Sequence, residues 1–90
     1  MPERTAIVGS SVGLHARPAA VFVQAAAAQA LPLIGIAKPG GEPVDARSIL
    51  SVLSLEVHGG DTVVLTAEGE GADAALDELA ALLAADLDAK

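Results

Sequence analysis

The position of Pro18 decides where the first long helix of this chain can begin. Proline lacks a backbone N–H group and has a fixed φ angle, so a helix accepts it in the first turn and breaks at it in the interior. The alanine-rich run after Pro18 favours helix strongly, and Gly13 gives the backbone freedom just before the turn. The sequence therefore predicts a helix over residues 16–29 and places His15 at or near its N-cap.

His15 and Arg17 together form a candidate phosphate site at this helix start. Free backbone N–H groups and the positive end of the helix dipole converge there, and an arginine can hold a phosphate through two parallel hydrogen bonds. The same positive environment disfavours the imidazolium, so His15 is expected to stay neutral and nucleophilic near pH 7. This chemistry describes a phosphohistidine carrier. The alternative is a capping or surface histidine beside an unrelated arginine, because short motifs also occur by chance.

The stretch GLHARPA at residues 13–19 resembles the active-site segment of the HPr family, the histidine-containing phosphocarriers of the phosphoenolpyruvate-dependent sugar phosphotransferase system. The similarity extends along nearly the whole chain, including RSILSVLSL at residues 47–55 and the turn GGD at residues 59–61. Two separated motifs in this order, in a chain of this size, make the resemblance specific.

The resemblance implies roles for several residues. His15 would accept a phosphoryl group on its pros nitrogen from phosphorylated Enzyme I, which phosphoenolpyruvate charges, and donate it to the IIA component of sugar permeases. Arg17 and the backbone N–H groups of Ala16 and Arg17 would hold the phosphoryl oxygens. The protein would be a carrier with a phosphohistidine intermediate rather than a stand-alone enzyme, and it would need no cofactor.

Length and composition indicate one small domain over residues 1–90. Apolar residues make up 52% of the chain, but Phe22 is its only aromatic residue, so aliphatic side chains and alanines must build the core. A net charge of −7 argues against a protein that binds nucleic acid or anionic membranes. The absence of cysteine and of an export signal favours a cytoplasmic protein. We also expect the protein to be a monomer. The apolar stretch 19–37 is not expected to span a membrane, because two glutamines, a proline and a glycine interrupt it.

Hydrophobic periodicity and turn residues predict the order β-α-β-β-α-β-α. The expected strands span residues 4–8, 31–37, 42–44 and 62–67, and the expected helices span residues 16–29, 49–55 and 72–89. Each helix needs one apolar face covered, which favours an α+β fold. By resemblance this is the HPr fold, an open-faced sandwich in which three helices cover one side of a four-stranded antiparallel sheet. The acidic face of the last helix is expected to be solvated.

The short helix at residues 49–55 is expected to carry a docking surface. It has more apolar side chains than one core-facing stripe can hide, so some of them should be exposed. HPr proteins, by resemblance, contact their partners with this helix. We therefore expect the docking surface to contain Ile49, Leu50, Leu53 and Arg47.

Ser48 is a candidate N-cap of the same short helix, and Asp45 is another. Ser48 also matches the position that some HPr proteins expose to a regulatory serine kinase, which makes such a kinase a candidate partner. Many HPr proteins carry basic side chains on the helix after the histidine, where this chain has Gln24 and Ala27. Attraction to partners should therefore depend less on charge than in those proteins.

Two other functions stay open at this point. An HPr-like carrier in a nitrogen-linked or dihydroxyacetone kinase phosphorelay would keep His15 and differ in its partners. A non-catalytic regulatory or ligand-binding α+β module would use His15 only as a cap. Metal binding is not expected, because His15 and His58 have neither a histidine partner at ligand spacing nor cysteine neighbours. His58 is expected to be exposed and without a function.

Overall fold

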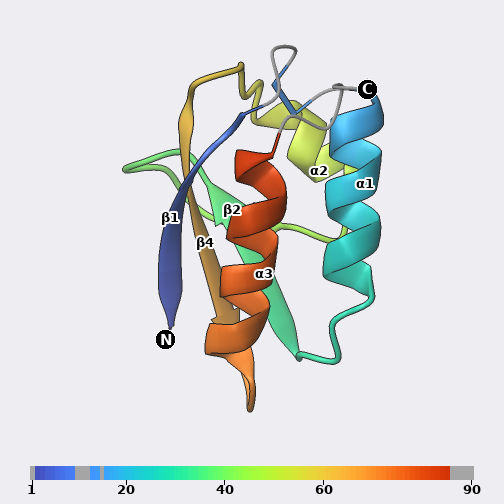
Figure 1. Ribbon diagram of the computed structural model, residues 1–90, viewed down its shortest axis with the longest axis vertical. Coiled ribbons are helices and arrows are strands. Elements are labelled where there is room, and N and C mark those ends of the chain that lie inside the picture. The colour runs from blue at the N-terminus through green and yellow to red at the C-terminus, as the bar shows by residue number, and fades with distance from the viewer. Residues whose placement is uncertain (1, 10–12, 15, 86–90) are drawn as a thin grey trace.

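The computed structural model describes residues 2–9, 13–14 and 16–85, and these residues form four strands and three helices (Figure 1). In chain order the elements are β1 (Glu3–Ile7), α1 (Ala16–Ala27), β2 (Leu33–Ala37), β3 (Val44–Asp45), α2 (Ile49–Ser54), β4 (Thr62–Glu68) and α3 (Ala72–Ala84). This is the predicted β-α-β-β-α-β-α order. Among the described residues, no helix is long and apolar enough to cross a membrane.

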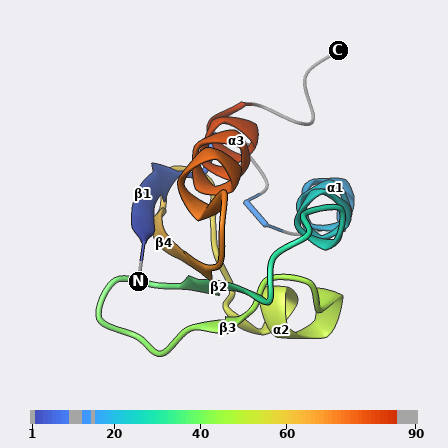
Figure 2. The ribbon, with the colours of Figure 1, turned by 90° about the horizontal axis from the view of Figure 1, so that it is seen from below.

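The four strands form one antiparallel sheet in the order β1-β4-β2-β3. β4 is one of the two inner strands and pairs on both edges, so that Thr66 lies opposite Glu3 of β1 and Gly35 of β2. The three helices lie on the same side of this sheet, with α3 over β1 and β4 and with α1 next to α2 (Figure 2). The predicted fold, an α+β open-faced sandwich with three helices on one side of a four-stranded antiparallel sheet, is therefore confirmed.

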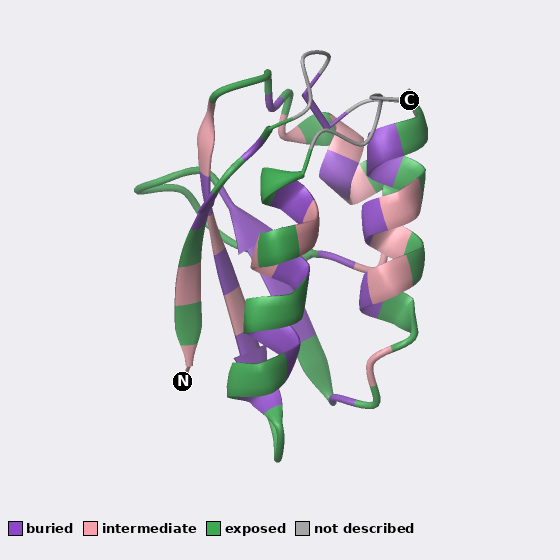
Figure 3. Ribbon diagram, viewed as in Figure 1, coloured by how far each residue is buried: buried purple, intermediate pink, exposed green. Residues whose placement is uncertain are grey.

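The core lies between the covered face of the sheet and the inward faces of the helices (Figure 3). Along β4, Val63, Leu65 and Ala67 are fully buried and alternate with partly exposed residues, as a strand with one covered face requires. Phe22 of α1 is also fully buried. The remaining fully buried large side chains are aliphatic: Leu14, Ile34, Ile36, Leu76, Leu79, Leu83, Val8, Val52 and Val57.

Several element ends differ from the sequence prediction. β2 begins at Leu33 rather than at residue 31, because Pro32 has no N–H group for the sheet ladder. α3 ends at Ala84, with Ala85 in an extended conformation, although the sequence predicted helix to residue 89. The last turn of α3 has no basic residue, and the aspartates at 86 and 88 would oppose the negative end of the helix. Residues 86–90 themselves lie outside the described part of the chain.

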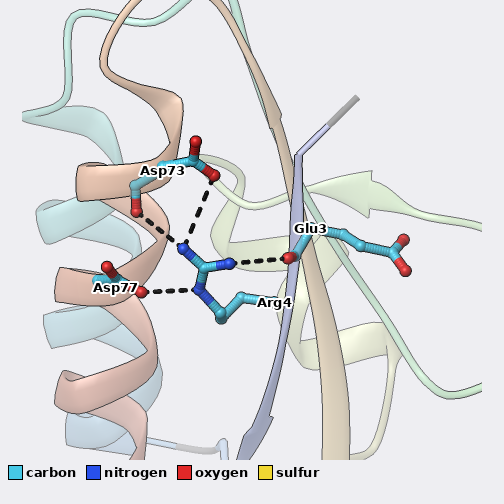
Figure 4. Close-up of polar contacts among 4 residues, drawn as sticks. All are labelled: Glu3, Arg4, Asp73 and Asp77. Carbon is cyan, nitrogen blue, oxygen red and sulfur yellow. Dashed lines mark hydrogen bonds and ion pairs between the residues drawn. The ribbon is translucent and has the colours of Figure 1, made fainter.

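The acidic face of α3 makes contacts that the sequence analysis did not expect. Nε of Arg4 on β1 donates to Oδ1 of Asp77 at 2.7 Å, and its Nη2 atom lies 3.7 Å from Oδ1 of Asp73 (Figure 4). Gln29, just after α1, donates to the carboxylate of Glu78. Asp73 and Asp77 are solvated as predicted, with side chains 78% and 69% exposed, but the carboxylates of this face also link α3 to an edge strand and to the residue that follows α1 by two positions.

Arg47 holds the C-terminal end of α1. Its Nε donates to the Ala26 carbonyl at 3.3 Å, and its Nη2 donates to the carbonyls of Gln29, at 2.9 Å, and Leu31. The last turn of α1 has no basic residue of its own, so this guanidinium is the cation that meets the negative helix end. The place of Arg47 on the docking surface stays a prediction, and its part-buried side chain also serves the fold.

We expect Arg47→Met to lower the free energy of unfolding by about 1–3 kcal/mol, because part-buried carbonyls would lose their donor. Thermal or urea unfolding measures this change. Lys38→Met is the matched control, since it removes one positive charge from an exposed site and should change stability by about 0.5 kcal/mol or less. Equal stability of the two variants would show that the Arg47 contacts do not hold the end of α1.

Candidate functional site

The start of α1 supplies the described part of the candidate phosphate site. Ala16 is the first residue of the helix and Arg17, which is exposed, is the second. Pro18 is in the first turn, as predicted. The first four N–H groups of a helix have no partner within it, so those of Ala16 and Arg17 belong to the set that can bind an anion. His15, the predicted phosphoryl acceptor, lies outside the described residues, and its role stays a prediction.

The backbone just before position 15 is packed tightly against the segment after α2. Gly13 has a φ of +74°, which confirms the expected need for glycine there. Leu14 is 1% exposed, and its N–H donates to the Val57 carbonyl oxygen at 3.0 Å. No local sequence signal predicts this contact, because it joins residues that are far apart in the chain.

The beginning of α2 has the predicted cap. Ser48 is in an extended conformation and its side-chain oxygen accepts the N–H of Ser51 at 3.4 Å. Asp45, the other candidate cap, accepts the N–H of Arg47 at 2.9 Å and so belongs to the turn that leads to the helix. Ser48 is half-buried.

The apolar residues of α2 divide between the core and the surface. Val52 is fully buried, and Leu53 is half-buried and packed against the core. Ile49 is 38% exposed and Leu50 is 77% exposed. Of the predicted docking residues, Ile49 and Leu50 are thus the ones with large exposed apolar side chains.

Helices α1 and α2 lie side by side and share an unusual charge distribution (Figures 1 and 2). Neither helix contains an aspartate or a glutamate, and Arg17 is the only charged residue in either one. The chain nevertheless carries 12 acidic residues and a net charge of −7. The acidic residues are therefore kept off the two helices that border the candidate phosphate site.

Three other features of the described residues bear on metal binding and on the alternative of a ligand-binding module. His58 is exposed, and its Nδ1 lies 3.6 Å from Oδ2 of Asp61. No group of three potential metal-ligating side chains occurs among the residues described. A pocket of about 350 Å³ is lined by residues that include Leu33, Gly35 and Arg47, and it contains no part of the start of α1.

Comparison with known proteins identifies the family. Residues 2–85 match the family model described as the PTS HPr component phosphorylation site. The chain belongs to the HPr family. The phosphocarrier protein HPr of Streptomyces coelicolor is 51% identical over 88 residues, which cover 98% of this chain and 94% of the relative.

Two further relatives belong to the same family. The HPr-like protein Crh of Bacillus subtilis is 40% identical over 81 residues, covering 90% of this chain and 93% of that protein. The crystal structure of the phosphocarrier protein HPr from Bacillus anthracis superimposes with a TM-score of 0.84 and 39% sequence identity. That superposition covers 91% of this chain and 95% of the other. The resemblance to HPr found in the sequence is thereby confirmed at the level of family and fold.

We expect Ser48→Asp to keep the melting temperature or to raise it by a few degrees. Serine and aspartate cap helices about equally well, and a negative charge at a helix start contributes about 0.3–1 kcal/mol. Ser48→Ala, in contrast, should lower the stability by about 0.5–2 kcal/mol, because the N–H of Ser51 loses its acceptor. Thermal unfolding of the three proteins measures both changes, and a clearly lower melting temperature for Ser48→Asp would contradict the cap.

Proposed function

We propose that this protein is a phosphoryl carrier of the phosphotransferase system. His15 accepts a phosphoryl group on its pros nitrogen from phosphorylated Enzyme I, which phosphoenolpyruvate charges, and donates it to the IIA component of a sugar permease. The observation that carries the proposal is the match of residues 2–85 to the HPr phosphorylation-site family, with His15 directly before a helix that starts at Ala16.

The transfer exchanges one phosphorus–nitrogen bond for another. A lone pair on the neutral imidazole of His15 attacks phosphorus while the bond from phosphorus to the donor histidine breaks. The protein then has mainly to position the group and to stabilise the charge on its equatorial oxygens. The Arg17 guanidinium and the N–H groups of Ala16 and Arg17 suit this task because they belong to the first two residues of one helix. No general base is needed, since the attacking nitrogen carries no proton.

The face formed by α1 and α2 is the proposed docking surface for both Enzyme I and the IIA component. Leu50 and Ile49 supply exposed apolar area, with the half-buried Leu53 behind them. Because these helices contain no carboxylate, a partner with acidic groups meets no repulsion from them, and Arg17 is available to pair with such groups. Arg47 contributes to this surface indirectly, since its donors hold the end of α1.

Further proposals follow from the same function. Residues 1–90 act as one domain and as a monomer. The protein works in the cytoplasm, where the partners of a phosphotransferase carrier work.

A serine kinase that recognises Ser48 would regulate docking. A phosphate at Ser48 would lie next to Ile49, and a partner would have to bury that charge to reach the apolar surface.

The decisive test is phosphorylation by Enzyme I with phosphoenolpyruvate and Mg²⁺, followed by mass spectrometry. We expect the parent protein to gain one phosphoryl group that is labile in acid and stable in alkali, as a phosphorus–nitrogen bond is. His15→Ala should remain folded and gain none. His58→Ala is the control, because it removes the other histidine, which is exposed, and should be phosphorylated like the parent.

Phosphorylation of His15→Ala would refute the assignment of the acceptor. A parent protein that gains no phosphoryl group would instead favour the regulatory or ligand-binding module.

We expect Leu50→Glu to weaken binding to Enzyme I strongly, because a buried unpaired carboxylate replaces apolar contact. Titration calorimetry at low and physiological salt measures the binding. Leu33→Glu is the matched control, since Leu33 is 42% exposed on the sheet rather than on the helical face, and it should bind like the parent. A harmless Leu50→Glu, with parent binding that falls steeply as salt rises, would show that charge rather than apolar contact controls docking.

A further inference from the structure

The chain that leads into position 15 lies against a backbone carbonyl and leaves no room for a side chain. A Cβ atom at Gly13 would collide with the Val57 carbonyl oxygen and would lie 2.6 Å from Cα of His58. Real Cβ atoms essentially never come that close to another heavy atom, and backbone atoms cannot rotate away as the end of a side chain can. Gly13 is therefore needed for close approach as well as for its φ of +74°.

The next residue fixes the same segment in two ways. The N–H of Leu14 donates to the Val57 carbonyl oxygen at 3.0 Å, and its side chain is buried in the core at 1% exposure. Val57 is itself fully buried, so the acceptor carbonyl belongs to a well-packed residue. The chain thus has little freedom immediately before it reaches His15.

Val57 is also close in sequence to the end of α2, the proposed docking helix. α2 ends at Ser54, and Glu56 then takes a φ of +53°, which turns the chain sharply towards Val57. The N–H of Glu56 donates back to the Leu53 carbonyl at 3.2 Å. Only two residues, Leu55 and Glu56, therefore separate the end of the docking helix from Val57, whose carbonyl holds Leu14.

The segment beyond Val57 is held as well. The N–H of His58 donates to Oδ2 of Asp61 at 2.9 Å, and the N–H of Asp61 donates to the His58 carbonyl at 3.0 Å. The N–H of Gly60 donates to the Val8 carbonyl at 2.8 Å, which joins this turn to the chain after β1. Gly13 and Leu14 thus pack against a segment whose backbone is hydrogen-bonded on both sides of Val57.

We propose that Gly13 and Leu14 are positioning residues, which set the place of His15 relative to the docking helix α2 through their contacts with Val57. A partner that docks on α2 then also contacts the segment whose backbone Val57 holds one residue before the phosphoryl acceptor. Transfer between two histidines depends on such alignment, because a displacement of about 1 Å can slow a positioned reaction by about 100-fold. This proposal rests on the proposed function and adds the requirement that the place of His15 be set relative to the docking helix α2.

The test compares Gly13→Ala with Gly40→Ala in transfer from phosphorylated Enzyme I. Both glycines have a positive φ, +74° and +79°, so both variants suffer similar backbone strain. A Cβ at Gly40, however, meets no atom within 4 Å, and Gly40 lies outside the turn that holds Val57. We expect Gly13→Ala to lower kcat about tenfold or more, with KM for phosphorylated Enzyme I within about twofold of the parent value. Gly40→Ala should change neither constant by more than about twofold.

Leu14 provides a second, independent comparison that remains valid if Gly13→Ala does not fold. Leu14→Ala should lower kcat by loosening the segment, and Leu14→Met, which keeps the side-chain volume, should recover most of it. Rates are measured per folded molecule, with the folded fraction taken from circular dichroism. A purely structural role would lower the folded fraction and leave kcat per folded molecule unchanged.

The outcomes separate this proposal from the function on which it rests. Phosphorylation of the parent together with an unchanged kcat in folded Gly13→Ala, or in Leu14→Ala, would refute the positioning role alone. An equal loss of kcat in Gly40→Ala, or a loss expressed only in KM, would also refute it. Failure of the parent to accept a phosphoryl group would refute the carrier function and the positioning role with it.

Discussion

The burial of one face of the sheet, seen along its inner strand β4, determines where the helices lie. Val63, Leu65 and Ala67 alternate with partly exposed residues, so helices can cover only one side. With a single aromatic residue in the chain, this core depends on many aliphatic side chains that fit closely together. The positions of the helices, including the start of α1 and the exposed face of α2, follow from the need to cover this one face of the sheet.

Much of this arrangement could be predicted because its signals are local in the sequence. Pro18 marks a first helical turn, Ser48 marks a cap, and alternation along residues 62–67 marks a strand with one buried face. These features depend on neighbours within one turn or one strand. The resemblance of residues 13–19 to a known active-site segment gave the family, which no pattern of propensities would have identified.

The features that were missed depend on contacts between distant residues. Arg47 reaches carbonyls 16 to 21 positions earlier, and Arg4 reaches a carboxylate 73 positions later. Nothing in the local sequence distinguishes either arginine from a free surface cation. The contact between Gly13 and Val57 was missed for the same reason: glycine before a turn predicts a positive φ, but it does not say which backbone lies against it.

The pairing of β1 with β4 has a consequence for folding during synthesis on the ribosome. Among the described strands, β1 pairs only with β4, so Glu3 has no partner in the sheet until Thr66 has been synthesised. At about 5–20 residues per second, translation needs roughly 3–13 s to cover that separation. During this interval the β2–β3 hairpin can form. β1 has no strand to pair with, so its apolar side chains remain exposed to water or to chaperones. The sheet therefore closes only after Thr62–Glu68 has been made, when β1 pairs with a strand about 60 residues further along the chain.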